Sequence, residues 1–247
     1  MIDYPPLRTP RLDVQLRELT IGEALQLAAV PPNKHERAMS ALLRLAMVRA
    51  GGEHQDPARW TVQERMLVMA HYISCVSETG ANFELGNGRF LDFLDPMADT
   101  GPEEIDAGAA CGDTWRIRQV YGAEAEAIEA ICGSRFDWTV ADMAARLRVQ
   151  DDEEPKAPDA VKEPHRYGEW LQAQVGVIKA MPESEFAELF ALYRAGLAGL
   201  NHLFRLEFDG DGHIVLPKHG KEGGPDLEPA RFPADACITE IARILGQ

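Results

Sequence analysis

The chain has 247 residues, 45% of them hydrophobic, and its 40 Asp and Glu against 25 Lys and Arg give a formal charge of −15. This length and balance are typical of one large globular domain, or two small ones, with an ample core. Because carboxylates repel phosphate groups and no basic cluster stands out along the chain, we expect neither nucleic acid nor an anionic membrane as a partner.

The lengths of the apolar runs and the spacing of the cysteines exclude further classes of protein. No apolar run approaches the roughly 18 residues of a membrane-spanning helix, so we expect no membrane span. Prolines stand in the first ten residues where the apolar part of a signal peptide would lie, and we expect no such peptide. The spacing of Cys75, Cys111, Cys132 and Cys237 contains no C-x-x-C pair, which excludes a zinc ribbon or a thioredoxin-type motif. Buried, reduced thiols in a cytosolic setting are the simplest interpretation.

The chain begins with a proline-rich arm and a strand. Three prolines in residues 1–10 predict an extended arm that is mobile or lies along a neighbouring subunit. Leu12, Val14 and Leu16 then alternate with polar residues, which is typical of a half-exposed strand. Such a strand, Arg11–Leu19, could pair with the sheet edge of a neighbour.

Two helices are predicted next from caps and apolar periodicity. Thr20 and Glu23 form a capping box at the start of the first, which is expected to stop at Pro31. Residues 35–50 repeat apolar side chains at helical spacing, and the glycines at 51–52 are expected to end this second helix.

A third helix is predicted over residues 62–77, with Thr61 and Glu64 as its capping box. Trp60, just before the cap, is expected to pack back onto the first helical turns. We interpret this segment as the central buried helix of the N-terminal region.

The middle of the chain predicts a hairpin, a loop and two short helices. Asn87-Gly88 between apolar runs indicates a β-hairpin near residues 83–93. Residues 95–113 are expected to form a loop with at most a short helical turn. Residues 124–133 and 139–149 predict amphipathic helices, separated by the segment between them.

An acidic, proline-rich stretch, residues 151–164, predicts a solvated linker. Helices are expected from residue 165 onward, with Pro182 at a first helical position. The apolar face of the second of these helices is predicted from Phe186, Leu189, Phe190, Tyr193 and Leu197. An irregular segment over 218–233 and a closing helix over 235–247 complete the region.

The predicted fold is therefore mainly α with a few short strands (α+β). We expect an arm at 1–10, a mainly helical region at 11–150, the linker at 151–164 and a helical C-terminal region at 165–247.

The strongest candidate for chemistry is the helix that carries Glu64, His71 and Cys75. A histidine and a cysteine four residues apart share a helix face and can hold a metal or form a nucleophile–base pair. A zincin helix, however, needs H-E-x-x-H, which is absent, and the capping box already accounts for Glu64. A satisfied structural histidine is the simpler interpretation.

Other motifs also fail their chemical requirements. Asp209–His213 resembles the start of a calcium loop but lacks the later ligands of an EF-hand, so a tight hairpin turn is favoured. Gly86–Gly88 and the glycines near 220–225 fit no phosphate loop, and no G-x-S-x-G elbow exists. We expect no enzyme, and no catalytic, cofactor-binding or metal-ligating residue.

Three stretches resemble proteins encoded in the tail modules of tailed bacteriophages and prophages: LRELTIGEALQLAAVPPNKHERAMSALLRLA at 16–46, WTVQERMLVMAHYISC at 60–75 and GNGRFLDFLD at 86–95. The similarity covers residues 12–95 and continues through 123–147 and the C-terminal helices. It is to baseplate-hub proteins related to those of T4-like phages, and to tail assembly chaperones. Such families are structural, so the resemblance implies no catalytic residue.

The resemblance implies a virion tail protein, assembled in the host cytoplasm, that acts in an oligomeric assembly through contacts with other tail and baseplate proteins. The residues expected to make these contacts are Tyr4, Pro5, Leu7 and Arg8 in the arm and Phe90 and Phe93 at the hairpin. We expect exposed apolar surface around Phe90, Leu91 and Phe93. The alternatives are a tail assembly chaperone, absent from the mature virion, and a metal- or thiol-dependent enzyme using His71 and Cys75.

Overall fold

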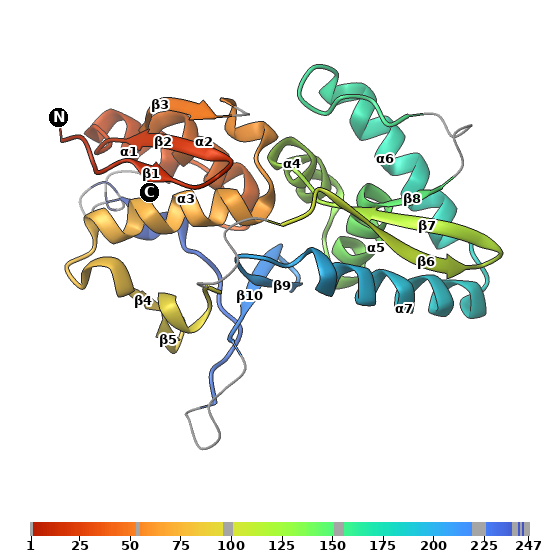
Figure 1. The fold of residues 1–247 in the computed structure, drawn as a ribbon. Helices are drawn as coiled ribbons and strands as arrows, with labels where there is room; N and C mark the ends of the chain where they lie inside the picture. The colour runs from red at the N-terminus through yellow and green to blue at the C-terminus, as the bar shows by residue number, and fades with distance from the viewer. Residues whose placement is uncertain are drawn as a thin grey trace.

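The computed structural model describes residues 2–52, 55–95, 101–150, 156–218, 226–238, 242 and 244. It is about 48% helical and 21% strand, with seven α-helices and several small sheets among the described residues, which confirms the mixed α+β class. In Figure 1 the red-to-orange N-terminal elements gather on one side and the green elements on the other. No helix of the described residues is long and apolar enough to cross a membrane.

A three-stranded antiparallel sheet opens the chain, with the order β1 (Leu7–Arg8), β2 (Leu12–Leu16), β3 (Met47–Gly52). The strand expected at residues 11–19 is confirmed, and its alternate residues are buried. Both of its edges are already paired within the chain, so β2 has no free edge for a neighbour's sheet.

The second predicted helix is shorter than expected. The helix α2 (His35–Ala46) ends where Met47 turns to an extended backbone, with ψ 124°. Residues 47–50 form part of β3, because their backbone groups pair with β2. The apolar periodicity of this segment continues past Ala46, so the sequence pattern alone could not mark the change.

Both predicted capping boxes are present. In α1 (Ile21–Ala28) the Thr20 hydroxyl accepts from the Glu23 amide, and the Glu23 carboxylate accepts from the Thr20 amide. In α3 (Val62–Val76) Thr61 and Glu64 make the same exchange at 3.2 and 2.8 Å. Trp60 is buried and α3 carries buried residues on most of its circumference, as expected of a central helix.

The N-terminal arm lies on its own subunit. The Tyr4 amide donates to the Leu16 carbonyl over 2.9 Å, and the Glu18 amide donates to the Ile2 carbonyl over 2.9 Å. The Tyr4 ring also meets the ring of Tyr72 edge-on at 5.5 Å. These contacts place the arm beside β2 and α3 rather than free in solvent.

The predicted hairpin forms with its turn one residue earlier than expected. β4 (Glu84–Leu85) pairs with β5 (Gly88–Arg89), so Gly86 and Asn87 occupy the turn. Gly86 has a φ of +59°. A positive φ at the first turn position is the signature of a type II′ turn, in which glycine is favoured there.

The exposed apolar surface expected after this hairpin is mostly absent. Phe90 and Phe93 are buried, and Phe90 stacks on Phe83 with ring centroids 5.1 Å apart. Phe232 joins this group, 6.1 Å from Phe90. The expectation of exposure was wrong for both rings, and Phe90 is covered by Phe232 of the C-terminal segment, distant in sequence; Leu91 stays exposed.

The loop expected at residues 95–113 is wrong in its second half. β6 (Glu104–Ala110) pairs with β7 (Asp113–Arg118), and β8 (Leu147–Val149) completes a three-stranded sheet; residues 96–100 are outside the described part of the chain. The sequence of β6 is rich in Ala and Gly, which have low strand propensity, so its alternation is weak.

Two glycines let helix α7 (Glu183–Leu200) lie close to this sheet. A Cβ atom on Gly196 would come 2.7 Å from Ile117 of β7, and one on Gly199 would come 2.8 Å from Ile105 of β6. Both distances are shorter than any ordinary carbon–carbon contact. At Gly196 the helix therefore packs against the sheet at a spacing that favours glycine, whereas at Gly199 the close atom is the end of the Ile105 side chain, which can shift.

Helices α4 (Gly122–Ile131) and α5 (Arg135–Arg146) confirm the two amphipathic helices, with different bounds. Residues 135–138, expected to separate the helices, form the first turn of α5. The Ser134 hydroxyl caps that turn by accepting from the Asp137 amide. Leu147–Val149, expected to be helical, belongs to β8 instead.

The described part of the predicted linker is packed onto the protein. Arg59 Nη2 donates to Asp159 Oδ2 over 2.9 Å, and Ala157 and Ala160 pack against the core. Residues 151–155 lie outside the described residues. The proposed domain boundaries stay a prediction.

The C-terminal region contains two helices and a hairpin. Helix α6 (Pro164–Lys179) precedes α7, and Pro182 stands at the N-cap of α7 rather than at its first helical position. β9 (Arg205–Phe208) and β10 (His213–Leu216) form the hairpin expected around Asp209–His213. The predicted closing helix falls largely outside the described residues, which include a 3₁₀ turn at Ala234–Cys237.

A buried ion network joins the N-terminal helices to the β9–β10 hairpin. Arg65 Nη1 of α3 donates to Glu36 Oε2 of α2 over 3.1 Å, and His213 Nδ1 lies 2.8 Å from Glu36 Oε1. All three side chains are buried. Burial raises the pKa of Glu36, but the charges of His213 and Arg65 outweigh it and lower that pKa to about 2.

Candidate functional site

The helix face with His71 and Cys75 makes structural contacts. His71 Nε2 lies 2.7 Å from the Pro5 carbonyl and so fastens the N-terminal arm. Burial raises the pKa of the Cys75 thiol, which keeps it protonated near neutral pH, its weakly nucleophilic form. Glu64 holds its capping box and pairs with Arg11, Nε to Oε1 2.7 Å. This arrangement gives the enzyme alternative no support.

The hairpin at Asp209–His213 is likewise held by side chains of the protein. Asp209 accepts hydrogen bonds from Arg231 and from the Asp211 amide. His213 points into the core and binds Glu36. Gly212, with a φ of +134°, supplies the turn conformation that other residues rarely adopt.

The residues predicted to contact partners divide into two groups. Pro5 and Arg8 are exposed, and Tyr4 and Leu7 are half-buried against their own subunit. Phe90 and Phe93 are buried in the core, so little of either ring faces solvent. No observation brings the arm and the hairpin residues into one surface, and their contact with partners stays a prediction.

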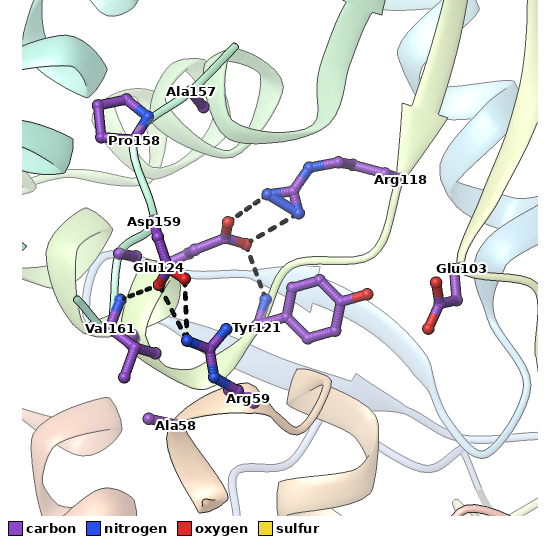
Figure 2. Close-up of a pocket in the computed structure, with 12 residues that line it drawn as sticks. Ala58, Arg59, Glu103, Arg118, Tyr121, Glu124, Ala157, Pro158, Asp159 and Val161 are labelled. Atoms are coloured by element: carbon purple, nitrogen blue, oxygen red, sulfur yellow. Dashed lines mark hydrogen bonds and ion pairs between the residues drawn. The ribbon is translucent and has the colours of Figure 1, made fainter. Parts of the chain in front are cut away.

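A charged cavity of about 430 Å³ lies between the 3₁₀ turn η1 (Pro57–Arg59), the start of α4 and the segment before α6. Figure 2 shows Arg59 reaching Asp159 and Arg118 reaching Glu124, with the Tyr121 ring between Arg59 and Glu103. The Tyr121 amide also donates to Glu124 Oε2 over 3.0 Å.

The charges of this cavity are arranged in pairs. Burial raises the pKa of Asp159, but hydrogen bonds from Arg59 and from nearby amides outweigh it and lower that pKa overall. Burial raises the pKa of the Tyr121 phenol, so it stays protonated at neutral pH. A small polar ligand would therefore have to displace an existing ion pair, which costs free energy.

A second hollow, here called the aromatic cleft, has a volume of about 450 Å³ and lies between α5, α7 and β9. Its aromatic walls are Phe136, Phe186, Phe190, Tyr193 and Phe208. Phe186, Phe190 and Tyr193 fall on one face of α7, and the first two rings stack 5.9 Å apart.

Phe136 completes the cleft from the first turn of α5. Its ring lies 6.4 Å from that of Phe186, yet 56% of the residue is exposed. Ser134 caps α5 one residue before Arg135, and this cap fixes the direction in which the first turn presents Phe136. A large apolar ring is thereby held at the mouth of an apolar hollow.

Charged groups form one rim of the aromatic cleft. Arg135 Nη2 donates to Glu207 Oε2 over 2.8 Å, and Arg194 pairs with the other oxygen of the same carboxylate. The arginine side chains are 68% and 50% exposed, whereas Glu207 is 12% exposed. Two guanidinium groups thus share one carboxylate and leave the rim with a surplus positive charge.

Sequence reasoning found part of this cleft. It predicted the apolar face of α7, and it assigned Phe136 to a segment between helices. The N-cap Ser134 with Asp137 three residues later is a signal that could have placed Phe136 on a helix. No short stretch of the sequence indicates that α5 and β9 pack beside α7.

Comparison with known proteins found no matching family model, no matching curated protein and no matching solved structure. The function must therefore be argued from the chain's own residues and geometry.

Proposed function

We propose that this chain is a structural or assembly protein of a bacteriophage or prophage tail, and that it acts in the baseplate through protein–protein contacts. The proposal joins the resemblance carried by residues 12–95 to the surface chemistry of the C-terminal region. In this role the chain works in the virion tail, in an oligomeric assembly with other tail and baseplate proteins.

The observation that carries the protein-contact role is the aromatic cleft with its exposed Phe136. Aromatic side chains and arginines are enriched at the centres of protein interfaces, where they contribute most of the binding free energy. The cleft combines five aromatic residues with two exposed arginines. An apolar hollow of this kind gains free energy when a partner removes it from water.

The charged cavity gives weaker support to a small-molecule function. Arg59 and Arg118, its two cationic groups, are already bound to carboxylates within the protein. The protonated phenol of Tyr121 and the protonated, half-buried thiol of Cys75 are both poor nucleophiles in these states. The surface features therefore support a role in protein–protein contact better than they support catalysis.

Mass spectrometry of particles purified from the phage or induced prophage that encodes the chain tests the proposal. A baseplate component is expected in the particles at a constant ratio to the other tail proteins. Absence from the particles would contradict the baseplate role. If the chain were instead recovered from lysates in complex with an unassembled tail protein, it would be a tail assembly chaperone.

A further inference from the structure

The aromatic cleft leaves apolar surface uncovered at a defined place. The Phe136 ring is tilted against the Phe186 ring at 6.4 Å, and Lys179 Nζ lies 5.7 Å from the centre of the Phe136 ring. Tyr193 and Phe208 at the floor are buried, so the hollow deepens from an exposed mouth to a closed base. This shape accepts a bulky side chain inserted from outside.

The polar groups around the cleft carry a positive balance. Glu207 is the one carboxylate among the lining residues, and it binds both Arg135 and Arg194. The nearby Lys179 is paired with Asp137 over 2.9 Å and is thereby neutralised. A positively charged rim is unusual on a chain whose formal charge is −15. It favours a negatively charged partner here, although the rest of the surface would repel one.

The two lining hydroxyls, of Tyr193 and Thr139, are already satisfied. The Tyr193 hydroxyl donates to Asp142 Oδ2 over 2.6 Å. Thr139 Oγ1 donates to the Arg135 carbonyl over 3.0 Å, one turn back in α5. Apolar contact and the two guanidinium groups are therefore what the cleft offers to an incoming ligand. Recognition needs an apolar group and an anionic group close together.

We propose that the aromatic cleft is the docking site for an acidic amphipathic segment of a partner protein. The segment places a large apolar side chain on Phe136, Phe186 and Phe190, and its carboxylates pair with Arg135 and Arg194. The inference rests on the proposed function: if the chain acts through protein–protein contacts, the cleft specifies the chemistry of one partner.

Guanidinium–carboxylate pairing explains how specificity arises. Glu207 occupies only part of the hydrogen-bonding capacity of two guanidinium groups, each of which carries five N–H donors. A carboxylate from the partner can bind the exposed edge of either group without breaking the pair with Glu207. Burial of the apolar side chain supplies most of the affinity, and the charges select against basic segments.

Fluorescence anisotropy with three labelled 12-residue peptides tests the proposal on the full chain. The first peptide alternates Glu with Leu and Phe, the second replaces every Glu by Lys, and the third replaces every Leu and Phe by Ser. The first should bind roughly tenfold more tightly than either of the others. Its affinity should also fall as salt rises, because part of it is electrostatic.

Two substitutions place the binding in the cleft. Phe136→Ala should weaken the acidic peptide roughly tenfold, and Arg135→Gln several-fold. Leu91→Ala and Arg44→Gln are matched controls, since they remove an exposed apolar side chain and an exposed arginine elsewhere, and should leave affinity unchanged. Circular dichroism checks the fold of each variant; Phe136 and Arg135 are exposed enough for truncation to be tolerated.

Four results would overturn the proposal. They are equal binding of the lysine peptide, no binding of the acidic peptide up to about 1 mM, an unchanged affinity in Phe136→Ala, and a dimer in analytical ultracentrifugation that Phe136→Ala dissociates. The dimer would identify a second copy of the chain as the occupant. The peptide-binding result and the proposed tail function can fail independently. The chain can bind the acidic peptide and yet be absent from purified particles, or be present in particles and yet not bind the peptide.

Discussion

Removing the buried Glu36 carboxylate should be costly for the stability of this protein. Replacing Glu36 by glutamine keeps the side-chain shape but leaves Arg65 and His213 facing a neutral amide. Both partners are fully buried, so water cannot compensate for the missing charge. The substitution thus tests whether the ion network stabilises the junction of α2, α3 and β10.

The expected loss follows from the pKa of Glu36. The network lowers this pKa from 4.5 to about 2. At about 1.4 kcal/mol for each pH unit, the folded state stabilises the ionised carboxylate by about 3 kcal/mol. Breaking a buried pair costs about 3–5 kcal/mol in other proteins, so we expect a loss in that range. Stabilities of natural domains are about 5–15 kcal/mol, and the variant should remain folded but marginal.

Urea denaturation followed by circular dichroism at pH 7 measures the effect. Glu104→Gln is the matched control, because Glu104 pairs with Arg116 at the surface and should cost less than about 1 kcal/mol. The pKa of Glu36 is lowered on folding, so its contribution is present above pH 4.5 and lost as pH falls toward about 2. The difference between wild type and Glu36→Gln should shrink over that range. An equal cost for Glu36→Gln and Glu104→Gln, or a difference independent of pH, would refute the reasoning.

Three further predictions concern packing, capping and thiol chemistry. Gly196→Ala should destabilise the protein by about 1–3 kcal/mol in urea denaturation, because its new methyl group would overlap Ile117. Gly176→Ala, in an open part of α6, should instead stabilise it by up to about 1 kcal/mol, and equal effects would contradict the close-packing argument. Thr61→Ala should cost about 1 kcal/mol through loss of the α3 cap, and a neutral result would show that the cap is dispensable. Partial burial raises the pKa of the half-buried Cys132 thiol to about 12, so its alkylation by iodoacetamide at pH 8 should be far slower than that of free cysteine; a similar rate would contradict the raised pKa.

Local signals predicted the parts of the fold that local interactions determine. The capping boxes at Thr20 and Thr61 and the turn at Gly86-Asn87 depend on residues within a few positions of one another. Each can therefore be recognised from a short stretch of sequence. The starts of α1 and α3 and the hairpin were accordingly placed within a residue or two, whereas α5 begins four residues earlier than predicted.

Long-range pairing determined the parts that sequence reasoning missed. Residues 47–50 continue the periodicity of the predicted helix, yet they belong to strand β3 because β2 supplies their hydrogen-bonding partners. Glu104–Ala110 has few large apolar residues and is a strand because it pairs with β7 and packs against α7. Tertiary context overrides propensity in both segments.

In the candidate site, too, locally determined features were predictable and long-range contacts were not. The periodic aromatic residues of α7 were predictable, whereas their meeting with Phe136 and Phe208 depends on how α5 and β9 approach that helix. Phe90 was expected at the surface because Phe232, more than 130 residues later, could not be seen to cover it. A residue's exposure is a property of the whole fold, so partner-contact surfaces are the hardest feature to predict from one sequence.

Deletion of the gene that encodes this chain most directly tests its proposed role in the assembly of a bacteriophage or prophage tail. Electron microscopy of the resulting particles should show heads with absent or defective tails, restored by the wild-type gene and poorly restored by one carrying Phe136→Ala. Particles with normal tails after the deletion would contradict the assignment.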